Sequence, residues 1–554
     1  MTQVKGFCRY SKFIFRRERI TSLIWAASLI FINTIVALAY IQLFDNDEAI
    51  QQMVGTLSSP AMQAIVGPVY GPEPITIDYI TIAFAQEMLV FMMIASAIMN
   101  IFFINRHTRT DEELGRLEMI RSLPVGRLTV AVSALVFAFG LNLAISVLMA
   151  LGLIAANVAG TTIAGAFVYS FAVGIAGFLF ACVTLLTAQV FQNARSASTW
   201  AFAALGIFYG VRAYADMAQN LTFNYISPLG LGLRVFAFWD NNFMPLIILL
   251  TECAAIAVIA LVICAKRDLG EGVVPARKGR KNASVFLQSP FGLAWRLTKN
   301  TVIIWLISMF AMGATYGAVL DDIGGFVESN DMFRQLIIGN DEEMLALLEI
   351  PEASQAIHEQ IKSMMVDSFV AFMYVIMALL ASVPVIIMAG KIHSEEKRGR
   401  LEGIFARSVN RYTMFGSYLL IALIASVAFM ISGAVGIYAV SSDLTNAGDL
   451  IKAAFVYVPS LLTMIGISVL LVGLLPKLTS LVWGVFAFSF VCVYFGRLLD
   501  LPEWLPKITP YGSIPQYTDI MAQDFSVVPV IVLSATAIIL TAAGMFMFRQ
   551  RDIA

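Results

Sequence analysis

Two short charged stretches hold the side chains whose types and spacing could support a function. Residues 111–118 read Asp-Glu-Glu-Leu-Gly-Arg-Leu-Glu, and residues 395–402 read Glu-Glu-Lys-Arg-Gly-Arg-Leu-Glu. A further arginine, Arg127 or Arg411, follows nine residues after the last glutamate of each stretch. Carboxylates and arginines on a short helix can pair with complementary charges on a docked surface. We therefore expect these stretches to bind another protein, and we expect no catalytic residue in the chain.

Two more carboxylates lie inside long apolar runs of the sequence, at Glu87 and Glu252. A carboxylate in the middle of a membrane span costs about 2.5–3.5 kcal/mol on insertion scales, so it usually faces protein or water. One interpretation places Glu87 and Glu252 on a substrate pathway, where they bind a cationic substrate or a proton. The other interpretation is a paired or protonated carboxylate near the outer interface, and the sequence leaves both open.

The sequence lacks motifs that other classes of protein require. No Gly-x-x-x-x-Gly-Lys-Ser/Thr motif is present, so we expect no ATP-binding loop and no bound cofactor in this chain. The five cysteines form no Cys-x-x-Cys pair and there are only three histidines, so we expect neither a disulfide framework nor a metal site. A net charge of -1 gives no overall field to recruit nucleic acid.

Membrane-spanning helices must position the charged stretches. Hydrophobic residues make up 59% of the chain and charged residues 13%, with a mean hydropathy of +0.81. The apolar runs cover about 20 residues or more, which is enough to cross a bilayer. They are continuous rather than alternating, which favours helices over a β-barrel. We predict an all-α polytopic protein with twelve transmembrane helices, at 21–43, 79–104, 128–156, 162–191, 197–215, 244–265, 301–320, 366–390, 413–440, 450–475, 479–499 and 527–548.

The distribution of lysine and arginine predicts the orientation. Residues 44–78 contain no Lys or Arg, and residues 321–365 carry ten acids against Arg334 and Lys362. Because Lys and Arg accumulate in cytoplasmic loops, the chain is expected in the cell membrane with both termini in the cytoplasm. Residues 3–19 combine basic and apolar residues at helical spacing and suggest a helix on the inner leaflet. The basic regions are the N-terminal segment and residues 105–127, 266–299 and 391–412.

The two charged stretches belong to an internal repeat with a period near 284 residues. The repeat divides the chain into an N-terminal half, 1–285, and a C-terminal half, 286–554, each with six spans. Because six is even, both halves have the same topology, and a pseudo-twofold axis along the membrane normal is expected. The acidic segment 321–365 is expected on the outer side of the second half.

Each charged stretch is predicted to form a short amphipathic helix near 107–124 or 393–408. A single basic loop could serve only to fix the topology. Two copies that share the Gly-Arg-Leu-Glu tetrapeptide at the same place in each half are better explained by a surface used twice, by two copies of one partner or by a partner pair.

The charged loops, the chain length and the internal repeat together carry a resemblance to a known family. The chain resembles the permease subunits of ABC exporters of the second permease class. Within that class it is similar to the tetronasin and polyketide-antibiotic exporters, whose permeases contain two halves fused in one chain. The resemblance implies that each loop is a coupling helix that sits in a groove of a separate ATPase subunit, most simply a homodimer, which binds the ATP and Mg²⁺. Pro124 departs from the second copy, which has Ser408, so we expect the two helices to end differently. The matching residues are Glu112, Gly115, Arg116 and Glu118, and Glu396, Gly399, Arg400 and Glu402.

The function expected on this basis is the export of a hydrophobic or amphipathic compound, with the membrane lipid and the ATPase as partners and without nucleic acid. Antibiotic export is implied by the resemblance alone. One rival is a twelve-span secondary transporter, which should carry its coupling charges within the spans. Another is a membrane enzyme acting on lipid-linked substrates, which would need acids or histidines clustered at one interface.

Overall fold

The computed structural model divides the chain into two compact units, Met1–Gly279 and Arg280–Ala554. Apart from a single bridge between Phe191 and Val274, the described residues form helices, turns and loops. Most of the predicted acidic segment 321–365 lies outside the described residues. The structure describes residues 2–43, 47–58, 60–218, 221–274, 282–320, 355–407, 409–442, 445–494, 502, 504–515, 517 and 526–551.

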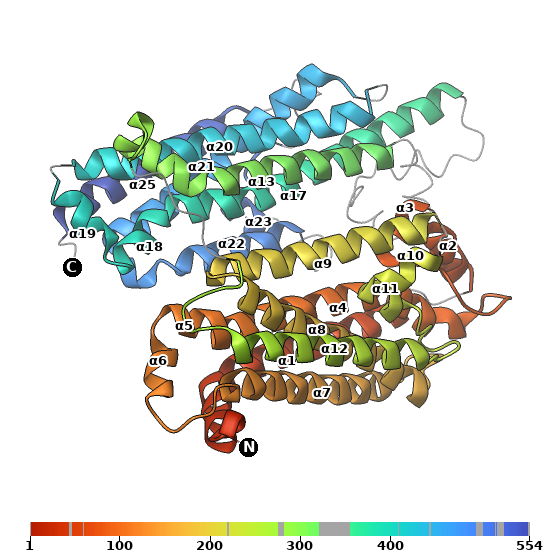
Figure 1. Ribbon diagram of the computed structural model, residues 1–554. Coiled ribbons are helices and arrows are strands. Elements are labelled where there is room, and N and C mark those ends of the chain that lie inside the picture. Colours follow the sequence, from red (N-terminus) through yellow and green to blue (C-terminus); the bar gives the residue numbers. More distant parts are fainter. Residues whose placement is uncertain are drawn as a thin grey trace. The chain divides into compact units, whose positions relative to one another are not determined.

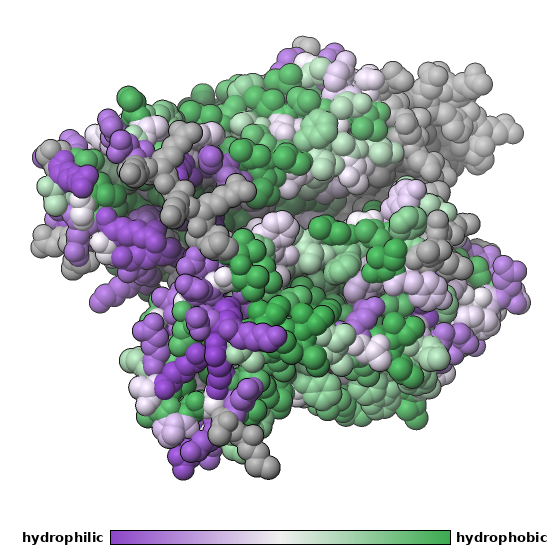
Figure 2. Space-filling model, in the orientation of Figure 1, coloured by the Kyte–Doolittle hydropathy of each residue, from purple (hydrophilic) through white to green (hydrophobic). Residues whose placement is uncertain are grey.

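Ten helices of the described chain are long and apolar enough to cross a membrane, and they coincide with ten of the twelve predicted runs. The side chains that cover these helices on the face drawn in Figure 2 are mostly apolar, and this suits contact with lipid. The chain is therefore a helical, multi-pass membrane protein. The ten helices are α1 (Phe7–Leu43), α4 (Ile80–Asn105), α7 (Thr129–Ala156), α8 (Ile163–Val190), α12 (Met244–Lys266), α13 (Pro290–Val319), α17 (Gln355–Ala389), α20 (Arg411–Val440), α21 (Ala447–Leu474) and α25 (Val528–Gln550).

The two remaining predicted spans, 197–215 and 479–499, are not among these ten. The first corresponds to α9 (Ala194–Met217), a helix of 24 residues that carries Arg195, Arg212 and Asp216 and is too polar to be recognised by hydropathy. The second corresponds to α22 (Leu481–Tyr494), which is strongly apolar but has only 14 described residues.

In unit 1, helix α8 lies at the centre and packs against α4, α7, α9 and α12 (Figure 1). Buried amides join two of its neighbours, because Asn142 Nδ2 on α7 donates to Asn100 Oδ1 on α4 at 2.9 Å. Gly177 of α8 faces this pair, and a Cβ there would lie 2.7 Å from Asn142 Oδ1. Interhelical amide bonds and small residues stabilise helix packing where water is absent.

In unit 2, glycines allow close packing of two helix pairs. Helix α13 packs along α20, where a Cβ on Gly436 would lie 2.2 Å from the carbonyl oxygen of Phe310. Helix α21 packs along α25, where a Cβ on Gly473 would lie 2.2 Å from the carbonyl oxygen of Gly544. Such close approach of two backbones requires glycine at the contact and maximises van der Waals packing.

Short helices cover the end of unit 1 that lies away from the N-terminus. They are α2 (Asp47–Leu57), α3 (Pro60–Val66), α10 (Leu221–Ile226) and α11 (Pro228–Leu233). Buried Arg212 of α9 fastens one of them, α3, since its Nη2 donates to the carbonyl oxygens of Ala64 at 2.8 Å and Ile65 at 3.0 Å. The connection between α9 and α12 therefore contains two short helices, α10 and α11.

Candidate functional site

The first charged stretch forms a helical corner at the end of α4. The helix continues through the π-helical turn η3 (Arg106–Thr110) into α5 (Asp111–Glu113), and α6 (Arg116–Arg121) begins after Gly115. We call residues 111–123 the first corner. Gly115 has a φ of 68°, a left-handed conformation that costs little only for glycine.

The second charged stretch forms the same kind of corner in unit 2. Helix α18 (Lys391–Lys397) is followed by Gly399, with a φ of 65°, and then by α19 (Arg400–Phe405). We call residues 395–407 the second corner. No other group lies within 4 Å of a Cβ built on Gly115 or Gly399, so the backbone conformation, and not crowding, requires glycine at both corners.

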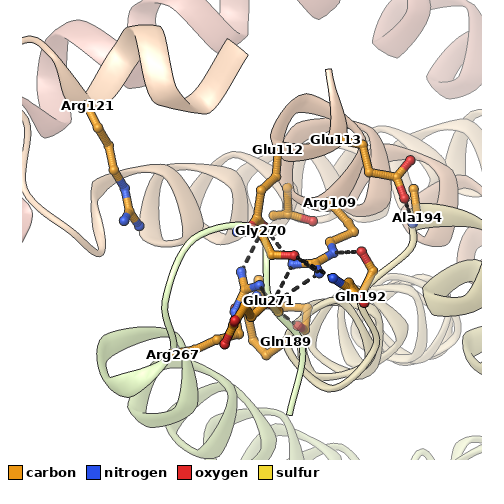
Figure 3. Close-up of polar contacts among 12 residues, drawn as sticks. Arg109, Glu112, Glu113, Arg121, Gln189, Gln192, Ala194, Arg267, Gly270 and Glu271 are labelled. Atoms are coloured by element: carbon orange, nitrogen blue, oxygen red, sulfur yellow. Dashed lines mark hydrogen bonds and ion pairs between the residues drawn. The ribbon is translucent and has the colours of Figure 1, made fainter. Parts of the chain in front are cut away.

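A buried glutamate ties the first corner to the end of helix α12. Glu112 Oε2 lies 2.8 Å from Arg267 Nη2 and 2.9 Å from Arg109 Nη1, and Glu112 Oε1 accepts a 2.7 Å hydrogen bond from the backbone N–H of Gly270 (Figure 3). The side chain of Glu112 is only 6% exposed. Because Arg267 follows the last residue of α12, the carboxylate links α5 directly to that helix.

Arg109 extends the link to the connection between α8 and α9. Its guanidinium donates to the carbonyl oxygen of Gln192 at 2.7 Å and twice to that of Glu271 at 3.1 Å (Figure 3). Glu113 Oε1 accepts a 2.6 Å hydrogen bond from the backbone N–H of Ala194, the first residue of α9. The first corner is therefore fastened to three helix ends of unit 1.

The same contacts recur at the second corner. Glu396 forms an ion pair with Arg551, which follows the last residue of α25, and its Oε2 lies 3.3 Å from His393 Nδ1. Arg400 pairs with Glu395 at 3.0 Å, as Arg116 pairs with Asp111 at 2.9 Å in unit 1.

The arginine that follows each corner also has the same partner. Arg127 donates to the carbonyl oxygen of Arg267, and Arg411 donates to that of Arg551. Each residue of the second set lies 284 positions after its counterpart, as Glu396 does after Glu112. The repeat in sequence is therefore also a repeat of contacts.

The predicted site residues separate into a buried set and an exposed set. Glu112 and Glu396 point inward and position the corners, whereas the side chains of Arg116 and Arg400 are 49% and 54% exposed. Glu118 and Glu402 are exposed as well, and their carboxylates form no ion pair within the described residues. In unit 1, hydrophilic side chains gather at the end that holds α5 and α6 (Figure 2).

Sequence reasoning missed Glu18, which joins the N-terminal helix to the turn η3 that precedes the first corner. Glu18 is 1% exposed, and its carboxylate lies 3.3 Å from Arg106 Nη1 and 3.1 Å from His107 Nε2. One residue earlier, Arg17 pairs with Asp111 at 2.6 Å. The basic stretch 3–19 is therefore the start of α1 and contacts the corner, and its single carboxylate was the available signal.

The two predicted pathway carboxylates are not brought together. Glu87 on α4 accepts a hydrogen bond from the hydroxyl of Tyr40 on α1, which favours the paired interpretation for this residue. Glu252 on α12 is half-buried and forms no ion pair within the described residues. No hydrogen bond or ion pair joins Glu87 to Glu252.

An acidic and aromatic cluster in unit 2 was also missed. The ring of Tyr374 on α17 stacks against Tyr457 at 5.7 Å and against Tyr517 at 6.1 Å between centroids. Burial, and then the negative charges of Asp367 and Asp449, raise the pKa of the Tyr517 phenol. Asp367 is the second residue of the predicted run 366–390. An acid at either end of an apolar run is common, so its position gives no sign of a cluster. In the described part of the chain, no three or more His, Cys, Asp or Glu side chains are grouped so as to hold a metal ion.

Comparison with known proteins gives the family. The model of the family described as "Multidrug efflux system permease Rv1217c, C-terminal domain" matches residues 12–264 and 287–549. The chain is 29% identical over 546 residues to the multidrug efflux system permease protein Rv1217c of Mycobacterium tuberculosis (strain ATCC 25618 / H37Rv), an alignment that covers 97% of this chain and 93% of the relative. This chain therefore belongs to the family of the multidrug efflux system permease Rv1217c.

Proposed function

We propose that this chain is the membrane-spanning subunit of an ATP-driven ABC exporter of the second permease class, and that it moves a hydrophobic or amphipathic compound out of the cell. The name of its relative, a multidrug efflux permease, supports export of such compounds. The observation that carries the proposal is the duplicated corner, in which a largely buried glutamate and a helix-end arginine are paired at the same place in both units.

The paired corners provide a path for mechanical coupling. A partner that binds α6 and moves it also moves Glu112, and the ion pair passes that displacement to Arg267 and α12. In unit 2 the same path runs from α19 through Glu396 to Arg551 and α25. Ion pairs that are largely shielded from water hold their geometry better than surface pairs do. The shielded ion pairs therefore transmit a displacement of each corner to the helix behind it. The exposed Glu118 and Glu402 contact the partner.

The energy must come from another subunit under this proposal. The sequence contains no ATP-binding loop motif, so ATP and Mg²⁺ are assigned to a separate ABC ATPase. Because the two corners share the same ion pairs and the same glycine turn, they fit two identical grooves on a partner. A homodimeric ATPase is the simplest partner with two such grooves. We place both corners and both termini on the cytoplasmic side of the cell membrane.

The course of α9 supports twelve spans arranged as two sets of six. Helix α9 begins beside the first corner, where Ala194 contacts Glu113, and its far end is fastened by Arg212 to residues of α3. Twenty-four helical residues extend about 36 Å, which is close to the thickness of a membrane. We therefore count α9 as a span whose polar side chains are covered by protein, and we count the run that contains α22 as its counterpart.

A twelve-span secondary transporter is the alternative. Such a protein couples export to an ion through charged groups inside its spans. Here Glu87 is already bonded to Tyr40, and neither Glu87 nor Glu252 has an acidic counterpart 284 residues later, where Ala371 and Thr536 stand. The duplicated charges lie in the corners instead, which favours an ATPase partner.

Transport into inside-out vesicles distinguishes the two functions. Vesicles that contain this chain and the ATPase that co-purifies with it should accumulate a fluorescent amphipathic compound when ATP is added, also after an ionophore has collapsed the proton gradient. Uptake that needs the gradient and ignores ATP would favour the secondary transporter. Vesicles that contain the chain alone are the control.

A further inference from the structure

The two corners share a frame but present different side chains at equivalent positions. The buried leucine is kept, because Leu117 is 6% exposed and Leu401 is 1% exposed. The exposed positions have diverged. The first corner exposes Leu114 at 58%, Met119 at 69% and Leu123 at 60%. The residues 284 positions later, also exposed, are Arg398, Gly403 and Arg407.

The exposed charges of the corners differ in the same direction. The first corner exposes Glu113, Arg116 and Glu118, two acids and one base. The carboxylate of Glu113 is engaged by the backbone of Ala194. The second corner exposes one acid and four bases, which are Glu402, Lys397, Arg398, Arg400 and Arg407. One corner thus presents an apolar surface with a slight negative charge, and the other a strongly basic surface without a large exposed apolar side chain.

The apolar residues of the first corner suit a protein groove better than a lipid surface. Helices that insert into the membrane interface usually surround their apolar residues with Lys and Arg, which attract anionic lipids. Around Met119 the first corner places Glu118 and only one exposed base, Arg116. An apolar patch of this kind typically gains stability in a desolvated pocket of a partner.

We propose that each ATPase groove has an apolar floor, an acidic rim and one basic group that pairs with the shared glutamate, Glu118 or Glu402, and that the two corners use the floor and the rim differently. The first corner anchors the ATPase by inserting Leu114, Met119 and Leu123 into the floor. The second corner binds through Lys397, Arg398 and Arg407 to the rim. The inference rests on the proposed function, since it assumes an ATPase partner. It assigns apolar anchoring to the first corner and charge pairing to the second, although the two corners are copies of one repeat.

Salt separates these two modes of binding. Apolar contacts change little with ionic strength, whereas exposed charge pairs are screened as the Debye length falls from about 10 Å at 0.1 M to about 3 Å at 1 M. Removing apolar residues should weaken binding at every salt concentration. Removing the basic residues should weaken binding at low salt and remove its dependence on salt.

Two matched triple variants test the proposal. One is Leu114→Gln, Met119→Gln and Leu123→Gln, and the other is Lys397→Gln, Arg398→Gln and Arg407→Gln. All six positions are exposed, so neither variant disturbs a buried contact. The chain is placed in nanodiscs of zwitterionic lipid, and the purified ATPase is titrated onto it at 0.05 M and 0.5 M NaCl.

We expect the first-corner variant to bind the ATPase at least tenfold more weakly at both salt concentrations and to keep the salt dependence of the wild type. The second-corner variant should bind several-fold more weakly at 0.05 M and like the wild type at 0.5 M. Equal salt dependence in the two variants, or its loss in the first-corner variant, contradicts the proposal. Wild-type chain that binds no ATPase at either salt concentration contradicts the proposed function itself.

Two further variants address the membrane and the steric fit. Met119→Cys in a Cys8→Ser background, labelled with a polarity-sensitive fluorophore, should report an aqueous environment until the ATPase is added. An apolar signal in nanodiscs alone assigns the patch to lipid and overturns the proposal. Gly403→Met should strengthen binding severalfold, because a Cβ at Gly403 meets no other group within 4 Å and the added side chain can reach the floor. Unchanged binding by Gly403→Met counts against a floor that accepts both corners.

Discussion

Glu112 and Glu118 belong to the same corner, yet their environments differ. Glu112 is 6% exposed and contacts Arg109, Arg267 and Gly270, whereas Glu118 is exposed and has no ion pair within the described residues. The sequence placed both residues on the docking surface, because a run of alternating charges gives no sign of which charge points inward. The inward direction of Glu112 depends on Arg267, which is 155 residues away in the chain.

Replacing Glu112 should loosen the first corner. In Glu112→Gln, Arg109 and Arg267 keep their charges but lose their carboxylate, and breaking such a shielded pair typically costs about 3–5 kcal/mol. We expect amide hydrogen exchange in residues 111–123 to accelerate strongly. Glu118→Gln is the matched control and should leave exchange unchanged, since the exposed carboxylate has no partner to lose. Equal exchange in the two variants would show that the ion pair does not hold the corner.

Alanine in place of either corner glycine should destabilise that corner. Gly115→Ala and Gly399→Ala force an L side chain into a left-handed conformation, which costs about 1–2 kcal/mol. Both variants should lower the thermal unfolding midpoint or raise hydrogen exchange at the corner. The control is Gly403→Ala, where the backbone is helical and the space is open, so alanine should be neutral or stabilising by about 0.5–1 kcal/mol. Destabilisation by Gly403→Ala of the same size would contradict the conformational explanation.

At the scale of elements, ten of the twelve predicted runs match helices that hydropathy alone identifies, because lipid-facing helices must be apolar along most of their length. Helix α9 is the exception. Its Arg212 and Asp216 are buried against each other and against the short helices at the end of unit 1, so its polarity is tolerated inside the protein. The sequence alone does not distinguish a polar side chain that bonds to a distant part of the chain from one that faces water.

Labelling on both sides of α9 and α22 tests the count of spans. If α9 crosses the membrane, Arg195→Cys should react with an impermeant maleimide only after permeabilisation, and Asp240→Cys should react from outside. For α22, Lys477→Cys should react inside and Lys507→Cys outside. Asp47→Cys, at the start of α2, and a cysteine at Glu343 serve as outer controls, and Leu114→Cys and Arg398→Cys serve as inner controls. External labelling at Arg195 or Lys477 would contradict twelve spans.

At the scale of the whole molecule, the repeat could be predicted from sequence, whereas the contacts that fasten each corner could not. The Gly-Arg-Leu-Glu tetrapeptides and the trailing arginines gave the period, and a local motif survives because its backbone needs a glycine at one position. The partners of Glu112 and Glu396 lie at the far end of each unit's chain, so only the folded structure reveals that each corner is clamped to a helix end. The packing inside the units has diverged, because Pro384 and Ser426 stand 284 residues after the paired Asn100 and Asn142 of unit 1.

The central claim is that an ATPase drives this permease through its two corners, and charge reversal at the exposed glutamates tests it most directly. The measurement is the ATPase rate of the partner in nanodiscs with wild-type chain, with Glu118→Arg, with Glu402→Arg and with both changes. Asp240→Arg, an exposed carboxylate reversed in the loop before α12, is the control. We predict that each single change lowers the stimulated rate, that the double change abolishes stimulation or association while membrane insertion is kept, and that the control behaves as the wild type. Full stimulation and normal transport by the double variant would contradict the claim.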